Sequence, residues 1–230
     1  MNCLLSVCLV AVTLAAGAAP AALAQSPVLQ KGVSVQMPVT VNAAPVPAAD
    51  STKAKIVAVT ANGSVYFGID SITLTDLAEK VKSTPFQRGE KLYIKADARL
   101  PYEKVLQVLE AARTEGVAPY VLLTAQSESS APGAIVPPTG LEVLLDPPPG
   151  AEPTVVQLVD FGQPEPVFKI NNQTTSWAGL PGALSSILQD TNEKVVRVKA
   201  DGRLPFGEVA RLIDVCHSTG AKVVLGSPNM

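Results

Sequence analysis

The sequence is poor in the residue types that carry most enzyme and metal chemistry. It contains one histidine, three cysteines and one tryptophan, and aromatic residues make up 4% of its 230 positions. The single histidine, His217, has no second His, Cys or carboxylate cluster at the spacing of a metal site. A glycine-rich phosphate loop, a nucleophile elbow and a paired-carboxylate arrangement are also missing. We therefore expect no catalytic residues, no cofactor and no metal, and we interpret the protein as something other than an enzyme.

Basic charge is not in excess either. The chain has 18 Lys and Arg residues against 20 Asp and Glu residues, which gives a formal net charge of −2. Nucleic acids and anionic lipids are attracted by a strongly basic field, and this composition does not supply one. We expect no nucleic-acid partner, and we expect protein partners to be recognised by shape or by strand pairing.

Charged side chains are missing altogether from residues 1–24. Cys3 to Ala16 form an apolar core, and Ala22-Leu23-Ala24 before Gln25 fits the small-x-small rule of signal peptidase. However, no Lys or Arg precedes the core, and about 20 apolar residues suffice to cross a bilayer. We expect residues 1–24 to be a signal peptide, or an inner-membrane anchor formed by residues 3–24. Both alternatives place the remaining domains in the cell envelope, on the periplasmic side.

One short phrase is used twice. KADARLPY over residues 95–102 returns as KADGRLPF over residues 199–206. After each copy, apolar residues follow the i, i+3, i+4, i+7 spacing of one buried helix face. The predicted helices, Pro101–Glu115 and Pro205–Thr219, begin with a proline, which suits a first helical turn, and each is followed by a glycine. This likeness indicates an internal duplication.

The pattern around the two phrases predicts an α+β fold. In each copy we expect two strands joined by a tight turn, then a short helix, a strand, the main helix and a last strand, the order ββαβαβ. The chain would then hold two tandem small domains joined by Pro-rich linkers. The expected parts are a Pro-rich linker with a strand-like segment at 25–54, a first domain at 55–124, a Pro/Ser/Gly-rich linker at 125–153 and a second domain at 154–230.

The first linker contains a candidate partner-binding strand. Apolar and polar residues alternate over residues 32–38, and the candidate residues are Val33, Val35, Met37 and Pro38. Such a strand can pair with the sheet edge of a partner, with the aliphatic side chains in alternate pockets. The alternative is that it packs permanently on its own chain, because exposed edges are commonly covered that way. The second linker has its own version at Gly140 to Leu145.

Two aspartates stand between a strand and a helix, one in each copy of the phrase. A lone Asp in such a place can be catalytic, but more often it accepts hydrogen bonds from nearby backbone N–H groups. We therefore assign Asp97, Pro101, Asp201 and Pro205 a structural role in the repeated motif.

The stretch at residues 32–38, the strand that ends at Tyr66-Phe67-Gly68, Lys95-Ala96-Asp97 and the helix that begins at Pro101 together resemble the periplasmic part of ExbD/TolR proteins. The resemblance covers nearly all of residues 26–124, and a looser second copy covers about 140–226. It implies a component of biopolymer transport in the envelope that works with an ExbB/TolQ-like membrane protein and a TonB/TolA-like protein. Because family members act as dimers, it also suggests self-association or an internal pseudo-dimer.

This sequence departs from the family at the membrane. Family members resemble one another in having an aspartate on the proton path inside a membrane helix, and here the corresponding place falls near Thr13. Residues 1–24 contain no acid, and threonine cannot bind and release a proton at neutral pH. The resemblance therefore implies the partner-binding function of the family and not its proton-coupled function. The alternative is a soluble periplasmic binding or scaffold module that has lost the proton-coupled motor role.

Overall fold

The computed structural model describes residues 33–87, 89–113, 118–126, 138–159, 167–171, 173–189, 191 and 193–226. The expected leader or anchor at 1–24 lies outside the described residues, as do residues 25–32 of the first linker and 127–137 of the second. Among the described helices, none is long and apolar enough to span a membrane.

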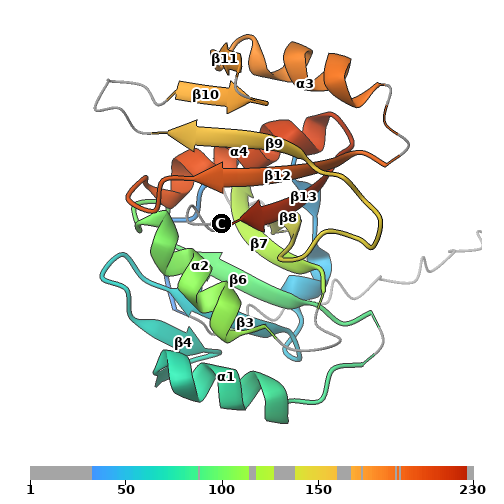
Figure 1. Ribbon diagram of the computed structural model, residues 1–230. Helices are drawn as coiled ribbons and strands as arrows, with labels where there is room; N and C mark the ends of the chain where they lie inside the picture. Colours follow the sequence, from blue (N-terminus) through green and yellow to red (C-terminus); the bar gives the residue numbers. More distant parts are fainter. Residues whose placement is uncertain are drawn as a thin grey trace, which may run out of the picture.

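The described chain is a mixed α/β structure with four α-helices and one large sheet (Figure 1). The first linker contains β1 (Val39–Thr40), β2 (Ala44–Pro45) and the short 3₁₀ helix η1 (Pro47–Asp50). The first half continues with β3 (Lys55–Val59), β4 (Val65–Phe67), β5 (Asp70–Ile72), α1 (Leu74–Ser83), β6 (Leu92–Ala96), α2 (Tyr102–Ala111) and β7 (Tyr120–Gln126). After β8 (Thr139–Leu144), the second half contains β9 (Thr154–Val159), β10 (Val167–Ile170), β11 (Gln173–Thr175), α3 (Leu180–Leu188), β12 (Val195–Ala200), α4 (Phe206–Ser218) and β13 (Lys222–Gly226).

Local sequence explains where α1, α2 and α4 begin. At α1, the Thr73 hydroxyl accepts a hydrogen bond from the Asp76 amide at 3.1 Å, and the Asp76 carboxylate accepts one from the Thr73 amide at 3.3 Å. This reciprocal pair is a capping box, which satisfies two amides that have no partner inside the helix. Helices α2 and α4 begin directly after Pro101 and Pro205, where the lack of an N–H group costs nothing.

The strand order in the sheet is β11-β10-β9-β12-β13-β8-β7-β6-β3-β4-β5. In the first half, β3 pairs antiparallel with β4 and parallel with β6, and β6 pairs parallel with β7. In the second half, β9 pairs antiparallel with β10 and parallel with β12, and β12 pairs parallel with β13. The two halves therefore have the same order of elements and the same strand pairings.

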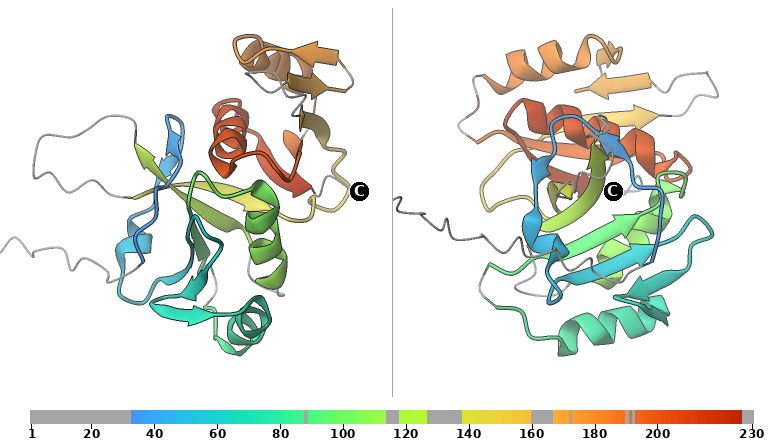
Figure 2. Two further views of the ribbon diagram at one scale, coloured as in Figure 1. Left: turned by 90° about the vertical axis from the view of Figure 1, so that its left-hand side faces the viewer. Right: turned by 180° about the vertical axis from the view of Figure 1, so that it is seen from behind.

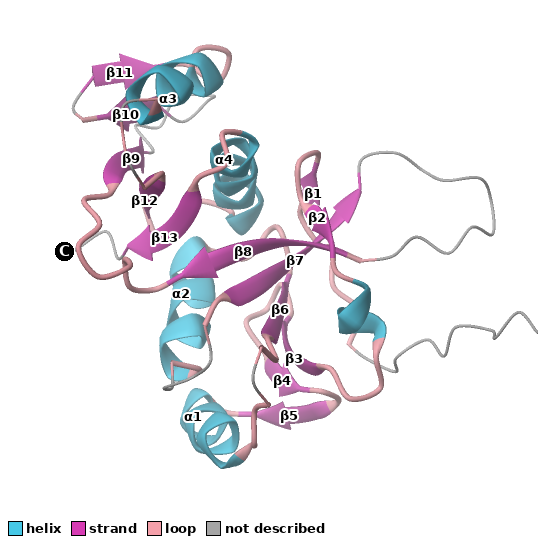
Figure 3. Ribbon diagram, turned by 90° about the vertical axis from the view of Figure 1, so that its right-hand side faces the viewer, coloured by secondary structure: helices cyan, strands magenta, loops and turns pink. Residues whose placement is uncertain are grey.

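Strand β8 joins the halves into one sheet. It pairs antiparallel with β7, where Val143 lies opposite Tyr120, and parallel with β13, where Val143 lies opposite Val223. Figure 3 shows β7 and β8 crossing the middle of the molecule between α2 and α4. The sequence assigned residues 125–153 to a linker, but β7 continues to Gln126 and β8 is a central strand.

Each half also has a short strand that the order ββαβαβ lacks. β5 and β11 follow tight turns at Gly68, with φ +66°, and Asn171, with φ +46°, and each is a three-residue edge strand. Their sequences, Asp-Ser-Ile and Gln-Thr-Thr, lack the apolar alternation that marks a half-buried strand. For this reason the sequence pattern did not indicate them.

The main helices of the two halves pack on the same face of the strongly twisted sheet: Tyr120 of β7, Val143 of β8 and Val223 of β13 are register neighbours and share one core with residues of α2 and α4. Because of this twist, α2 (green) and α4 (red) lie on opposite sides of the β7–β8 pair in Figure 2. Strand β8 contributes Leu141 and Val143 to a single hydrophobic core that extends through both halves. Among the described α-helices, none packs on the other face of the sheet, which the first linker with η1 covers in the first half.

Candidate partner-binding site

The two copies of the repeated phrase lie against each other. Pro101 and Pro205 form an isolated antiparallel bridge. The first amides of a helix have no acceptor inside it, and here each copy supplies the carbonyl groups that the helix of the other copy needs. Bonds of 2.8 to 3.0 Å run from the amides of Tyr102, Glu103, Phe206 and Gly207 to the carbonyls of Leu204, Gly202, Leu100 and Ala98, respectively.

The aspartates of the phrase close the turn between strand and helix. The Asp97 carboxylate accepts hydrogen bonds from the backbone amide of Arg99 at 3.1 Å and from its Nε at 2.9 Å. The Asp201 carboxylate accepts the same pair from Arg203, at 3.0 and 3.1 Å. The arginine hydrogen bonds lower the pKa of both carboxyl groups, that of Asp201 to about 2. Both groups are therefore ionised across the physiological pH range.

Among the described residues, Asp97 makes one further hydrogen bond that Asp201 does not make. Its Oδ2 accepts a hydrogen bond from the amide of Gln36 at 3.1 Å, and the amide of Ala98 donates to the carbonyl of Gln36 at 2.7 Å. The Asp97 side chain is consequently only 3% exposed, against 25% for Asp201. The first copy of the phrase thus holds the backbone of the first linker.

More contacts fix this linker on both sides of Gln36. Upstream, Lys95 Nζ donates to the carbonyl of Val33 at 3.0 Å, and burial lowers the pKa of this lysine. Downstream, the amide of Ala125 donates to the carbonyl of Pro38 at 2.8 Å, and β1 then pairs parallel with the end of β7. Residues 33–40 are therefore an extended segment that crosses β6 and β7.

Burial alternates along the segment that holds the candidate residues. Val33, Val35 and Met37 are half-buried, Pro38 is buried, and Ser34 and Gln36 between them are exposed. The strand itself begins only at Val39, so residues 33–38 are not a β-strand as the sequence suggested. In this structure the segment packs on its own chain. Met37 joins a small apolar cluster with Val46, Ala49, Ala54, Ile56, Tyr93, Val121 and Leu123.

A chain of three buried hydroxyl groups fixes the end of the segment. Thr40 Oγ1 donates to Thr124 Oγ1 at 2.8 Å, and Thr124 Oγ1 lies 2.9 Å from Thr139 Oγ1. Thr139 Oγ1 donates to the carbonyl of Thr124 at 3.1 Å. Because Thr139 donates there, Thr124 is the donor between the two hydroxyls. The chain connects the first linker, β7 and β8.

Helix α4 of the second half also binds the first linker. The buried carboxylate of Asp214 accepts hydrogen bonds from the amides of Val41 at 3.0 Å and Asn42 at 2.9 Å, and from Asn42 Nδ2 at 3.0 Å. Sequence reasoning missed this residue, because an acid on a helix is usually exposed and no motif marks the exception. The first linker is therefore held by both halves.

The remaining chemically active side chains do not gather into a site. In the described part of the chain, no group of three or more His, Cys, Asp or Glu residues could hold a metal. His217 Nε2 lies 2.9 Å from the carbonyl of Glu142, and burial lowers the pKa of the imidazole. Cys216 is buried, which raises the pKa of its thiol to about 12. A thiol with this pKa is not a nucleophile at neutral pH.

The protein has a mixed α/β fold in which an extended linker packs across the sheet beside a strand-to-helix turn. Residues 21–127 match the family model described as biopolymer transport protein ExbD/TolR. The matched part of the chain includes the segment, the Asp97 turn and the whole of β7. No curated protein and no solved structure matches the chain significantly.

Proposed function

We propose that the protein is a non-enzymatic, partner-binding subunit of envelope biopolymer transport, linked to a TonB/Tol-type system. In this function it works with an ExbB/TolQ-like membrane protein and a TonB/TolA-like protein. The observation that carries the proposal is the docked segment of residues 33–40, which lies inside the part of the chain that matches the ExbD/TolR family model.

The chemistry of the docking allows exchange with a partner. The contacts from Lys95, Asp97 and Ala98 all go to backbone atoms of the segment, so another extended peptide can make the same bonds. Selectivity then comes from the half-buried side chains at Val33, Val35 and Met37. A partner strand of similar pattern competes for this surface and releases the segment, which becomes free to bind elsewhere.

We infer further that the chain arose by tandem duplication and that its halves form an internal pseudo-dimer. Three observations support this inference. The repeated phrase recurs in sequence, the two halves have the same element order, and the bonds between the two phrases are reciprocal. Reciprocal bonds are what a two-fold interface requires, because residue i contacts j while the counterpart of j contacts the counterpart of i.

Photo-crosslinking in cells tests the partner-binding proposal. A photoreactive residue replaces Ser34, which is exposed within the segment, and the matched control replaces Lys82, which is exposed on α1. We expect crosslinks from position 34, and none from position 82, to an ExbB/TolQ-like or TonB/TolA-like protein identified by mass spectrometry. Crosslinks from position 34 only to the protein's own chain would contradict the proposal.

A second candidate function is a soluble periplasmic binding or scaffold module. It is favoured by one observation, the lack of any acid in residues 1–24, since an intramembrane carboxylate is the group that could carry the proton. The mass of the mature protein separates the two candidates. A soluble species that begins at Gln25 favours the scaffold, and a full-length species in alkali-washed membranes favours the membrane-linked subunit.

A further inference from the structure

The second half has a sheet face that corresponds to the one covered by the first linker. Strand register defines the correspondence row by row. In the first half, Tyr66, Ala58 and Lys95 are neighbours across β4, β3 and β6. In the second half, Lys169, Gln157 and Lys199 are neighbours across β10, β9 and β12. The next row is Ile56, Tyr93 and Val121 in the first half and Val155, Arg197 and Val224 in the second.

The two faces differ in what lies on them. Residues 33–54 cover the first face, with Met37, Val46 and Ala49 packed against it. In Figure 1 the second face is turned toward the viewer, with α4 behind it, and no described helix or strand crosses in front of β9 and β12. Gln157 is exposed there, and Val155 and Val159 are partly exposed.

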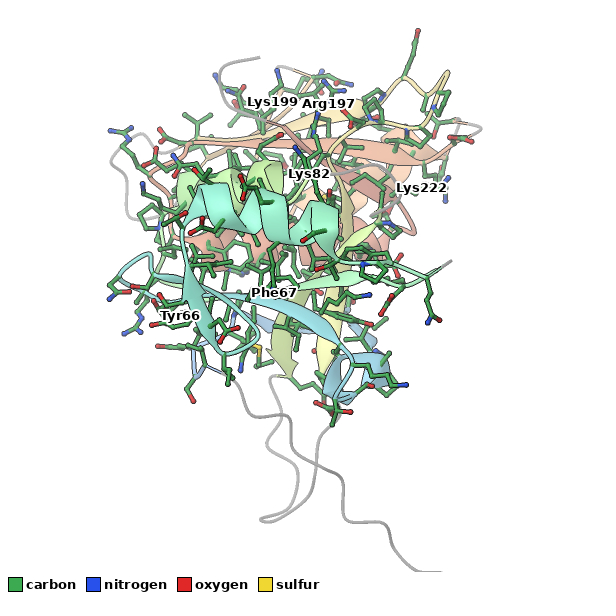
Figure 4. All side chains as sticks on the ribbon, turned by 90° about the horizontal axis from the view of Figure 1, so that it is seen from below. Tyr66, Phe67, Lys82, Arg197, Lys199 and Lys222 are labelled. Carbon is green, nitrogen blue, oxygen red and sulfur yellow. The ribbon has the colours of Figure 1, made fainter. Side chains whose placement is uncertain are left out.

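The two faces also differ in charge. Tyr66 and Tyr93 of the first face are replaced at the corresponding positions by Lys169 and Arg197. Figure 4 shows Arg197 and Lys199 on one side of the molecule and Tyr66 on the opposite side. Lys222 on β13 adds a further cation. Among the described residues of β9, β10, β12 and β13, no position that points to this face is an acid.

At the edge of this face, the second copy of the phrase repeats the groups that hold the segment in the first half. Lys199, Asp201 and Gly202 correspond to Lys95, Asp97 and Ala98. In the described part of the chain, the Asp201 carboxylate accepts hydrogen bonds only from Arg203, and it is 25% exposed where Asp97 is 3% exposed. Nε of Arg197 is a buried donor with no hydrogen-bond partner there.

We propose that this second face binds an extended acidic peptide of a partner protein, in which Asp or Glu alternates with aliphatic residues. The peptide backbone meets Asp201 and Gly202 as Gln36 meets Asp97 and Ala98. Its carboxylates pair with Arg197 and Lys222, and its aliphatic side chains cover Val155 and Val159. The inference goes beyond the proposed function, because it assigns a second site, of different charge preference, on the opposite side of the molecule.

NMR spectroscopy of the mature full chain tests this proposal with defined probes. The first probe is a synthetic peptide Val-Glu-Val-Glu-Met-Pro, and its matched control is Val-Lys-Val-Lys-Met-Pro. We expect the acidic peptide to shift amide signals of β9, β10 and β12, with saturation in the micromolar to millimolar range, and the lysine peptide to cause no saturable shift there. Equal shifts from both peptides, shifts confined to β6 and β7, or no shift at millimolar acidic peptide would overturn the proposal.

Variants then locate the site. We expect Arg197→Gln combined with Lys222→Gln to weaken binding of the acidic peptide at least tenfold, and Lys95→Gln to leave it within twofold. An unchanged affinity in the double variant would overturn the proposal, and the amide spectrum reports whether that variant is folded. Crosslinking from position 34 does not involve this face, so the partner-binding proposal and the second-face proposal can fail separately.

Discussion

At the scale of the residue, the two phrases differ at one fully buried position. Tyr102 and Phe206 correspond, and the Tyr102 hydroxyl has no hydrogen-bond partner among the described residues. An unpaired buried hydroxyl costs about 1–3 kcal/mol. We expect Tyr102→Phe to raise the free energy of unfolding by about 1 kcal/mol, and Phe206→Tyr to lower it by about 1–3 kcal/mol. Urea denaturation measures both, and a Tyr102→Phe variant less stable than wild type would contradict the expectation.

The aspartates of the phrase make stability depend on pH. Their folded-state pKa values lie below the ordinary value of about 3.9, so their stabilising effect is complete above about pH 4. It is lost as the pH falls through the folded values, near 2 for Asp201 and lower still for Asp97. We expect Asp97→Asn to cost about 1–3 kcal/mol at neutral pH, and more than Asp201→Asn, because Asp97 is buried and also holds Gln36. Denaturation measured at several acidic pH values gives the free energy of unfolding as a function of pH. This free energy should fall less steeply with decreasing pH for Asp97→Asn than for wild type, and equal slopes would argue against this role.

At the scale of the element, the first linker depends on a helix from the other half. Asp214 of α4 accepts the amides of Val41 and Asn42. We expect Asp214→Ala to speed hydrogen exchange of these two amides at least tenfold, because they lose their acceptor. Glu110→Ala, which removes an exposed acid from α2, is the matched control and should leave their exchange unchanged. Exchange that responds equally to both variants would mean that the linker is held by other contacts.

The positions of the two main helices could be predicted from the sequence pattern. The predicted helix Pro205–Thr219 is observed as Phe206–Ser218, because its periodicity, proline and glycine all agree. The helix predicted at Pro101–Glu115 is described as Tyr102–Ala111. Periodicity reports which face of an element is buried but not what buries it. For this reason the sequence identified the half-buried residues of the first segment without deciding whether a partner or the chain itself covers them.

At the scale of the whole molecule, a local pattern does not say which strands become neighbours, and this explains why the sequence did not place β8 at the centre of the sheet. Residues 140–145 have an apolar pattern that two neighbouring strands can satisfy, and nothing local specifies those neighbours as β7 and β13. Asp214 was missed for a related reason, since its partners lie far away in the sequence. The charge difference between the two sheet faces likewise becomes visible only when strand register places Lys169 beside Gln157 and Lys199.

The continuous sheet predicts that the two halves unfold together. A Cβ atom on Gly140 of β8 would lie 2.4 Å from Val121 Cγ1 and 3.3 Å from the carbonyl oxygen of Leu122, so the Val121 side chain or the β7–β8 pair must shift to accept it. We expect Gly140→Ala to cost about 1–3 kcal/mol, as overpacking in a core does. Calorimetry should show one transition that shifts as a whole to lower temperature, because one core and one sheet connect the halves. Gly182→Ala in α3, where a Cβ atom meets nothing within 4 Å, is the matched control and should leave the melting temperature unchanged or raise it. Two separate transitions, with only one moved by Gly140→Ala, would mean that each half folds on its own and that β8 only tethers them.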